Sequence, residues 1–414
     1  DTEEQKERVL LVGVQLDNQE DMESSLEELK ALAKTAGAET VGKVIQPRDA
    51  YHPATYIGKG KLEEVRSLIE ETGATGIICD DELSPAQLRN LEDALGTKVM
   101  DRTMVILDIF ASRATTSEGK IQVEVAQLKY RSTRLTGLGT TLSRLGGGIG
   151  TRGPGEKKLE TDRRIIRDRI SRLSKDLEEI KNHREVARQN RSRTAVPVAA
   201  IVGYTNAGKS TLLNYMTDAG ILSEDKLFAT LDPTTRAMNL PNGEKILLTD
   251  TVGFIRKLPH NLIEAFKSTL EEAKYADIIV HVVDASSPDR DIQMDVVYKT
   301  LKELEVGDKP VVTLFNKCDK FENGDTEAPV LRDFKADETA YISARTGSGI
   351  ADFEAILEKI IRESRVHLVQ IFAYADAGKI QQIRAQGQLI KEEYTENGIE
   401  VEAYVPKALY QKLQ

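Results

Sequence analysis

Cysteine is scarce in this chain of 414 residues, and long apolar runs are missing. Cys79 and Cys318 are the only cysteines, too few for a disulfide framework or a cysteine-bound metal cluster. No apolar run exceeds about eight residues, whereas a helix needs roughly 20 to cross a bilayer, so no membrane contact is expected. The first residues are acidic and polar, without the apolar segment of an export signal, which predicts a cytoplasmic location.

Positive charge is in deficit over the whole chain, but one segment reverses the balance. The chain has 57 Lys and Arg against 67 Asp and Glu, a formal net charge of −10 that argues against indiscriminate nucleic-acid binding. Residues 118–194, however, carry 19 basic and 10 acidic side chains. This segment is where a polyanion could bind.

The length exceeds what one hydrophobic core usually organises, so several domains are expected. Residues 9–16, 39–45 and 76–79 are typical of buried strands, and helical patterns alternate with them, including a helix that begins at Ser84 and Pro85. This alternation predicts a parallel α/β domain over residues 1–112.

Residues 113–194 have a different character. Apolar residues recur on one helical face in two runs: Ile121, Val125 and Leu128, then Leu159, Ile166, Leu173 and Ile180 at seven-residue spacing. Between the runs, residues 137–155 are too rich in glycine for a helix or strand. We expect an antiparallel helical hairpin with the glycine loop at its tip; a solvated linker between two domains is the alternative.

A phosphate-binding loop of the form GxxxxGK[ST] follows a strand at residues 198–202 and opens a helix. It comprises Gly203, Tyr204, Thr205, Asn206, Ala207, Gly208, Lys209 and Ser210, with Thr211 next in the helix. The loop's N–H groups and the helix N-terminus favour phosphate oxygens. Lys209 is expected at the β and γ phosphates, and the Ser210 hydroxyl at Mg²⁺.

Three further motifs follow predicted strands. Asp250, Thr251, Val252 and Gly253 form DxxG, the predicted switch II, in which Asp250 holds the metal through water and Gly253 presents its N–H to a γ phosphate. Asn316, Lys317 and Asp319 belong to NKxD, and Ser343, Ala344 and Arg345 end the last strand, with the Ser343 and Ala344 backbone facing guanine O6. The Asp319 carboxylate can accept two hydrogen bonds from guanine but not from adenine, which predicts GTP over ATP.

Each motif alone has a common structural explanation, such as a glycine turn or an aspartate helix cap. Together, at the carboxyl ends of successive strands, they match the place where open α/β sheets bind ligands. Residues 195–364 are therefore predicted to be a P-loop NTPase G domain, an α/β fold with a mostly parallel sheet flanked by helices, which hydrolyses GTP to GDP with Mg²⁺. A structural ATPase is disfavoured by Asp319.

Switch I should supply a threonine for Mg²⁺ and the γ phosphate, and the residues alone leave Thr230, Thr234 and Thr235 as candidates. After Gly253 comes Phe254, which cannot orient an attacking water as a glutamine does, so intrinsic hydrolysis is expected to be slow. No catalytic base is assigned.

Residues 365–414 are predicted to be a small α+β domain. We expect strands at 367–374 and 399–404 and a helix over 377–394, without chemistry of their own.

Several stretches outside the nucleotide motifs carry a family resemblance. They are YIGKGK at 56–61, DRT at 101–103, ILDIF at 106–110, QLKY at 127–130 and GGGIGTRGPGE at 146–156. Over nearly its whole length the chain resembles the HflX family, in the Obg–HflX group of translation-related GTPases. Related Obg proteins carry their switch I threonine in Phe-x-Thr-Leu, which places switch I at Phe228, Ala229, Thr230, Leu231 and Asp232 and makes Thr230, with Ser210, the metal ligand.

The resemblance implies binding to the large ribosomal subunit and its rRNA, ribosome-stimulated GTP hydrolysis, and dissociation or rescue of stalled or idle ribosomes under stress. Some members of the family also use ATP through the N-terminal domain, and this sequence shows no second phosphate loop. A monomer without DNA contact is expected.

The basic hairpin agrees with an RNA partner, and the residues predicted to contact RNA are Arg131, Arg134, Arg144, Arg152, Lys157 and Lys158. The alternative for these residues is a solvated coiled-coil face. The alternative function is a GTP-dependent regulatory switch that recruits a protein partner without splitting ribosomes.

Overall fold

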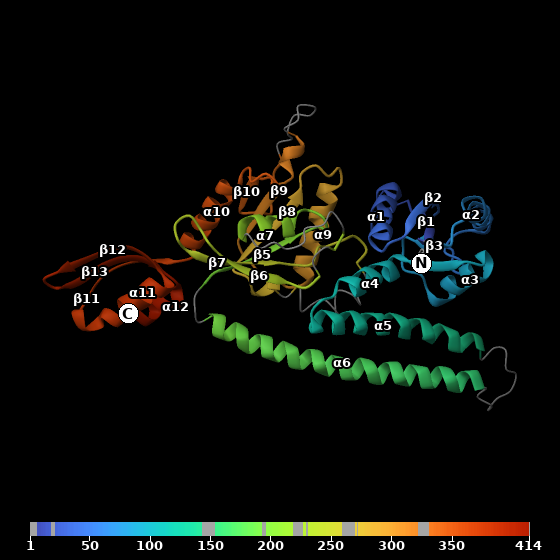
Figure 1. Ribbon diagram of the computed structural model, residues 1–414, viewed down its shortest axis with the longest axis horizontal. Coiled ribbons are helices and arrows are strands. Elements are labelled where there is room, and N and C mark those ends of the chain that lie inside the picture. The colour runs from blue at the N-terminus through green and yellow to red at the C-terminus, as the bar shows by residue number, and fades with distance from the viewer. Residues whose placement is uncertain are drawn as a thin grey trace, which may run out of the picture. The chain divides into compact units, whose positions relative to one another are not determined.

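The computed structural model describes residues 6–17, 21–142, 154–192, 196–217, 227–228, 231–258, 270, 272–321 and 331–413 (Figure 1). The chain divides into two compact units whose segments alternate along the sequence. Unit 1 is Asp1–Ile180, Glu224–Asp232 and Ile255–Ser268; unit 2 is Lys181–Ser223, Pro233–Phe254 and Thr269–Gln414. In the described part of the chain, no helix has the length and apolarity needed to cross a membrane.

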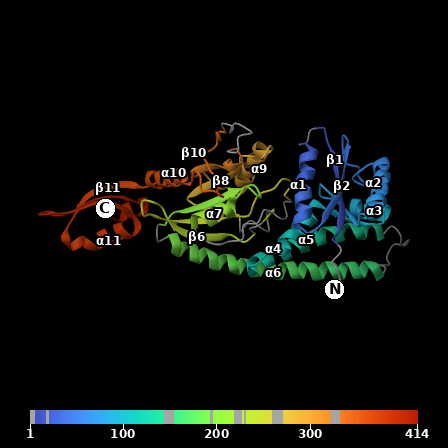
Figure 2. The same ribbon diagram turned by 45° about the horizontal axis from the view of Figure 1, so that its top comes forward.

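Unit 1 contains the expected parallel α/β fold. Its sheet has the order β2-β1-β3-β4, with every pair parallel, built from β1 (Arg8–Gln15), β2 (Glu39–Pro47), β3 (Gly76–Cys79) and β4 (Lys98–Asp101). The helices are α1 (Met22–Thr35), α2 (Lys59–Thr72), α3 (Pro85–Leu95) and α4 (Arg102–Arg113). Figure 2 shows α1 on one side of the sheet and α2 with α3 on the other. Because both faces are covered, β1 is an almost continuous buried apolar run.

The start of α3 shows how local sequence sets these elements. Ser84 caps the helix by accepting from the Gln87 N–H, and the Gln87 side chain accepts from the Ser84 N–H. Pro85 occupies the first turn, where its missing N–H costs nothing. The predicted start at Ser84 and Pro85 is confirmed.

The two long helices are α5 (Ser117–Leu142) and α6 (Pro154–Ser192). They lie antiparallel, because Glu124 pairs with Arg169 at 2.8 Å while Leu135, further along α5, accepts from Arg163, earlier in α6. Of the predicted seam residues whose side chains are described, Leu173 is buried and Ile166 and Ile180 are half-buried. The predicted glycine loop over 137–155 is wrong at both ends, because α5 continues to Leu142 and α6 begins at Pro154. Its central part, residues 143–153, lies outside the described residues.

Unit 2 contains a six-stranded sheet with the order β10-β9-β8-β5-β7-β6, in which only the β6–β7 pair is antiparallel. The strands are β5 (Val198–Gly203), β6 (Thr234–Asn239), β7 (Lys245–Asp250), β8 (Ile278–Asp284), β9 (Val311–Asn316) and β10 (Glu338–Tyr341); the helices are α7 (Lys209–Thr217), α9 (Arg290–Glu303) and α10 (Ile350–Glu363), with a 3₁₀ turn, η1 (Cys318–Lys320). The parallel strands end at one edge, which brings their following loops together. The predicted G-domain fold is confirmed.

The C-terminal part of unit 2 is a three-stranded antiparallel sheet of order β11-β13-β12 with two helices. Its elements are β11 (Val366–Phe372), η2 (Tyr374–Asp376), α11 (Ala377–Gln386), β12 (Gln388–Thr395), β13 (Gly398–Val405) and α12 (Lys407–Leu413). The expected helix over 377–394 is wrong in its second half. The chain leaves the helix at Gly387, where a Cβ would lie 2.9 Å from the Tyr404 carbonyl, and then pairs with β13.

Candidate nucleotide site

The phosphate loop lies between β5 and α7, as the motif predicts. Gly208 adopts a φ of +99°, and a Cβ there would collide with the Asn316 amide nitrogen, so only glycine fits. The loop leads directly into α7, whose N-terminus supplies partial positive charge. This segment therefore has the geometry of an anion cradle.

The Lys209 side chain is folded back onto this loop. Its Nζ donates to the carbonyls of Gly203, at 3.1 Å, and Tyr204, at 2.8 Å. Burial lowers the pKa of Lys209 to about 8, against the opposing attraction of Asp250. A phosphate in the loop would compensate that burial, because a buried ammonium is stabilised by a fixed anion.

Nucleotide affinity should depend on this titration. Above about pH 8 the free protein loses the Lys209 proton, whereas bound phosphate favours the charged form, so binding takes up a proton. We expect GDP affinity to fall between pH 7 and 9, by up to about tenfold per pH unit above the pKa. Calorimetry in buffers of different ionisation enthalpy measures the proton uptake. Lys209→Arg is the matched control, because arginine stays charged; an equal uptake in that variant would assign the proton to another group.

Ser210 and Asp250 meet beside the loop. The Ser210 hydroxyl donates to Asp250 Oδ2 at 2.7 Å, and Asp250 is completely buried at the end of β7. These hard oxygen donors suit Mg²⁺. Among the described residues, no group of three or more His, Cys, Asp or Glu could hold a metal ion.

The DxxG segment packs tightly against the phosphate loop. A Cβ on Gly253 would lie 2.8 Å from Thr205 Cα and 3.0 Å from Lys209 Nζ, which explains the glycine. The following Phe254 is buried, its carbonyl accepts from Thr205 N at 2.7 Å, and its N–H donates to Gly203 O at 3.1 Å. Phe254 is thus a structural bridge between the two loops.

Asn316 joins three loops of the site. Its Nδ2 donates to the Ala207 carbonyl at 2.8 Å, and its Oδ1 accepts from the Ala344 N–H at 2.9 Å. Lys317 donates to the Asn206 carbonyl at 2.8 Å and pairs with Asp284 at 2.8 Å. Asp284, at the end of β8, was missed by the sequence analysis because it belongs to no motif.

Asp319 accepts at Oδ1 from the Ser343 hydroxyl at 2.7 Å, which fixes one carboxylate oxygen. The Ser343 N–H donates to Ser348 O at 2.9 Å, and the Ala344 N–H donates to Asn316. Both amides therefore have protein partners, which differs from the expectation that they face guanine O6. Arg345, beside them, is exposed.

Of switch I, the structure describes Phe228, Leu231 and Asp232, while Ala229 and Thr230 lie outside the described residues. The other two candidate threonines, Thr234 and Thr235, are built into β6 and pair with β7. The Thr235 hydroxyl lies 2.9 Å from that of Thr249. Thr230 stays the metal ligand that the family resemblance predicts.

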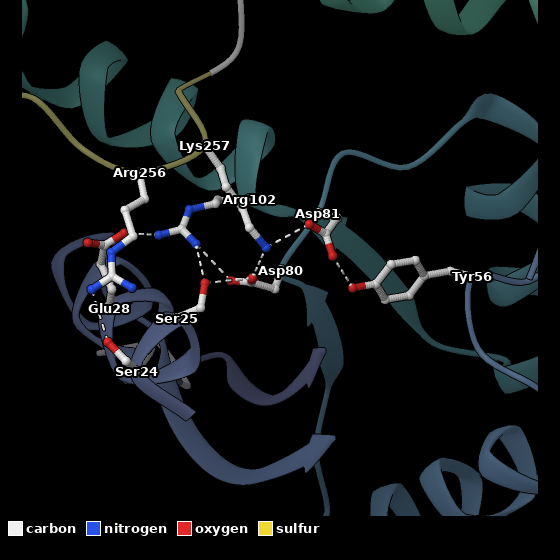
Figure 3. Close-up of polar contacts among 9 residues, drawn as sticks. All are labelled: Ser24, Ser25, Glu28, Tyr56, Asp80, Asp81, Arg102, Arg256 and Lys257. Atoms are coloured by element: carbon white, nitrogen blue, oxygen red, sulfur yellow. Dashed lines mark hydrogen bonds and ion pairs between the residues drawn. The ribbon is translucent and has the colours of Figure 1, made fainter. Parts of the chain in front are cut away.

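A buried charge cluster lies at the carboxyl end of β3, in unit 1 (Figure 3). Asp80 accepts from Arg102 at 2.8 Å and Ser25 at 2.8 Å, and also from Lys257, which follows switch II. Asp81 accepts from Lys257 at 2.7 Å and from the Tyr56 hydroxyl at 2.5 Å. Although burial opposes it, Arg102 and Lys257 lower the pKa of Asp80. These contacts fix the chain just after switch II to the carboxyl end of β3 within unit 1.

The hairpin residues predicted to contact RNA have different surroundings. Arg131 is exposed, but Arg134 pairs with the buried Asp101 at 2.6 Å and stacks over the Tyr130 ring at 3.9 Å. Arg134 thus holds α5 to the end of β4. Arg144 and Arg152 lie outside the described residues, and the side chains of Lys157 and Lys158 are not described.

Three family models match consecutive parts of the chain. Residues 23–111 match the GTP-binding GTPase N-terminal region, and residues 113–191 match the GTP-binding GTPase middle region. Residues 198–317 match the model described as 50S ribosome-binding GTPase.

Whole-chain relatives are also found. A GTPase HflX of Lacrimispora saccharolytica is 65% identical, over 99% of this chain and 96% of the relative. GTPase HflX of Escherichia coli is 42% identical, over 94% and 91%. A crystal structure of a GTP-binding protein from Sulfolobus solfataricus with GDP aligns over 87% of this chain and 99% of that one, at 26% identity and a TM-score of 0.44.

Proposed function

Because this chain belongs to the GTPase HflX family, we propose that it binds the large ribosomal subunit and uses GTP binding and hydrolysis to dissociate or rescue stalled or idle ribosomes. The chain is a GTPase with a G domain that binds guanine nucleotide. The ribosomal part of the proposal is carried by the match of residues 198–317 to the 50S ribosome-binding GTPase model. A cytoplasmic location follows from such a partner.

The nucleotide chemistry follows from the loop contacts. The amides of the phosphate loop bind the phosphates, and Lys209 leaves the Gly203 and Tyr204 carbonyls to contact the β and γ phosphates. Asp319 selects guanine through N1–H and the exocyclic amine, while Ser343 fixes the carboxylate's orientation. Ser210 and Thr230 would hold Mg²⁺ directly and Asp250 would hold it through water; the bound ion would neutralise phosphate charge.

Slow intrinsic hydrolysis follows from Phe254. Its side chain is buried and its backbone is used in the bridge to the phosphate loop, so it cannot orient a water molecule. We infer that the ribosome completes the hydrolytic site, either by ordering switch I or by supplying a polar group.

The α5–α6 hairpin is the RNA-binding element of the proposal. Residues 118–194 hold an excess of nine basic side chains, and small glycines between the helices allow close approach to a narrow RNA cleft. Arg131, Arg144, Arg152, Lys157 and Lys158 are the proposed phosphate contacts, and Arg134 is assigned to Asp101 instead.

Charge reversal at the tip tests the hairpin's role. The double variant Arg144→Glu/Arg152→Glu is expected to lose stimulation of GTP hydrolysis by purified 50S subunits, because repulsion replaces phosphate neutralisation. GDP affinity should stay within about threefold of wild type, since no residue of the nucleotide site changes. Steady-state phosphate release with and without 50S subunits measures the effect.

The matched control is Arg172→Glu/Lys175→Glu, two exposed positions further along α6. If both double variants lose stimulation equally, the effect comes from the overall charge of the hairpin, and Arg144 and Arg152 have no specific role. Sedimentation of 70S ribosomes with the protein and a non-hydrolysable GTP analogue tests splitting directly. If 50S subunits do not stimulate GTP hydrolysis and 70S ribosomes do not separate, the alternative function is favoured, a switch that recruits a protein partner.

A further inference from the structure

The carboxylate of Asp232 lies at the start of α5, 117 residues away in sequence from its first partner. It accepts from the N–H groups of Thr115 and Thr116, both at 2.9 Å. It also accepts from their hydroxyls, at 2.7 and 2.6 Å. All three residues belong to unit 1. One side chain of switch I thus takes four hydrogen bonds from the two residues before Ser117.

These contacts orient the cap of α5. The Thr116 hydroxyl gives its proton to Asp232 and accepts from the Gly119 N–H at 2.9 Å, which is the bond of a helix N-cap. Because a hydroxyl has one proton, donation to Asp232 leaves its lone pairs directed toward the helix. Asp232, Thr116 and the first turn of α5 therefore form one continuous hydrogen-bonded chain.

Gly119 supplies an independent sign of this close approach. A Cβ at Gly119 would collide with Asp232 Oδ1. Glycine inside a helix costs about 1 kcal/mol relative to alanine, so the position is unfavourable for α5 by itself. The space is occupied by the switch I carboxylate.

The rest of the described switch I is packed on the same unit. Phe228 is buried and meets Phe110 of α4 edge to face, with ring centroids 4.6 Å apart, and Leu231 is also buried. Burial alone would raise the pKa of Asp232, but the hydrogen bonds from Thr116 and Thr115 lower it, so the carboxylate is charged at neutral pH. Phe228 is therefore fixed by packing, and Asp232 by hydrogen bonds, to other residues of unit 1.

We propose that Asp232 is a positioning residue that ties switch I to the N-terminal cap of α5. In P-loop GTPases, switch I becomes ordered when it contacts the γ phosphate and is released after hydrolysis. Because Asp232 connects switch I to the N-terminal cap of α5, this conformational change would be transmitted to the hairpin helix. Coupling between two sites is reciprocal: a partner that holds α5 shifts the switch I equilibrium by the same factor, commonly about 5- to 150-fold. This inference rests on the proposed ribosome contact of the hairpin and gives it a physical route to the nucleotide.

A double-mutant cycle tests the tie. Asp232→Ala removes the acceptor of all four hydrogen bonds, whereas Thr116→Val removes the one hydroxyl that joins Asp232 to the cap of α5. Both are expected to lower the stimulation factor, kcat with purified 50S subunits over kcat without, by about tenfold. The double variant should be no worse than Asp232→Ala alone, because the Thr116 hydroxyl acts through Asp232. Thr116→Ser keeps the hydroxyl and should restore wild-type stimulation. Additive losses, or full stimulation in both single variants, would overturn the assignment.

A second measurement needs no ribosome. Hydrogen exchange of the peptide covering residues 113–122 should differ between the GDP and GTP-analogue states of the wild type, and both single variants should remove that difference. Persistence of the difference in the variants would also overturn the tie. If wild type itself shows no 50S stimulation while the exchange difference depends on Asp232, the proposed function fails and the tie stands.

Discussion

Lys209→Met is expected to weaken GDP and GTP binding at least about 100-fold, because it removes two charge-assisted hydrogen bonds to phosphate of about 1.5–3 kcal/mol each. The ammonium is buried beside the loop carbonyls. Hydrolysis of GTP should fall by about 100-fold or more even at saturating nucleotide, since the same charge stabilises the transferring phosphoryl group. Fluorescent-nucleotide titration and single-turnover hydrolysis measure the two effects separately.

The control for this change is Lys302→Met, an exposed lysine in the last turn of α9. It should bind and hydrolyse as wild type. If Lys209→Met binds GDP and GTP with wild-type affinity, Lys209 does not contact the phosphates and the phosphate-loop interpretation is wrong. A loss of the folded state, seen as a lowered unfolding temperature without nucleotide, is not expected, because methionine fills the same volume without a charge to bury.

Asp319→Asn should exchange the base preference of the site. Guanine loses the acceptor for its exocyclic amine and meets an amide N–H₂ instead, so GTP binding is expected to fall about 100-fold or more. Xanthine carries a carbonyl at that position and can accept from the new amide. Xanthosine triphosphate should therefore become the better substrate, with the phosphate chemistry unchanged.

Competition between GTP and xanthosine triphosphate measures this exchange, with Asp308→Asn in an exposed loop as the control. The amide oxygen that Asp319→Asn introduces can still accept from Ser343, so the local fold should persist. A variant that keeps its GTP preference would show that Asp319 does not contact the base.

The nucleotide loops could be predicted from sequence because their chemistry needs fixed residue types at fixed spacing. Gly208 has to be glycine to let Asn316 approach, and Asn316 has to reach Ala207 and Ala344. Because each requirement fixes a residue type at a fixed spacing, short sequence motifs reveal these loops. The motifs lie at strand ends as predicted: β5 ends at Gly203, β7 at Asp250 and β9 at Asn316.

What could not be predicted depends on partners far apart in the chain. Residues 388–394 are rich in Lys and Glu, which favour helix, but pairing with β13 overrides that preference. The Asp80 cluster takes its cations from Arg102 and Lys257, 22 and 177 residues away, and no local pattern reveals this. The boundaries after residues 112, 194 and 364 stay predictions; the two units are interleaved in sequence.

That interleaving has a consequence for how the nascent chain folds. Asp80 is synthesised 177 residues before Lys257, which at about 5–20 residues per second means roughly 10 to 35 s of elongation. During this time the first α/β core can form, but with Asp80 and Asp81 lacking one of their cations. The core of unit 1 therefore reaches its native packing only after part of unit 2 has been synthesised. The two units finish folding together, and not in order of synthesis.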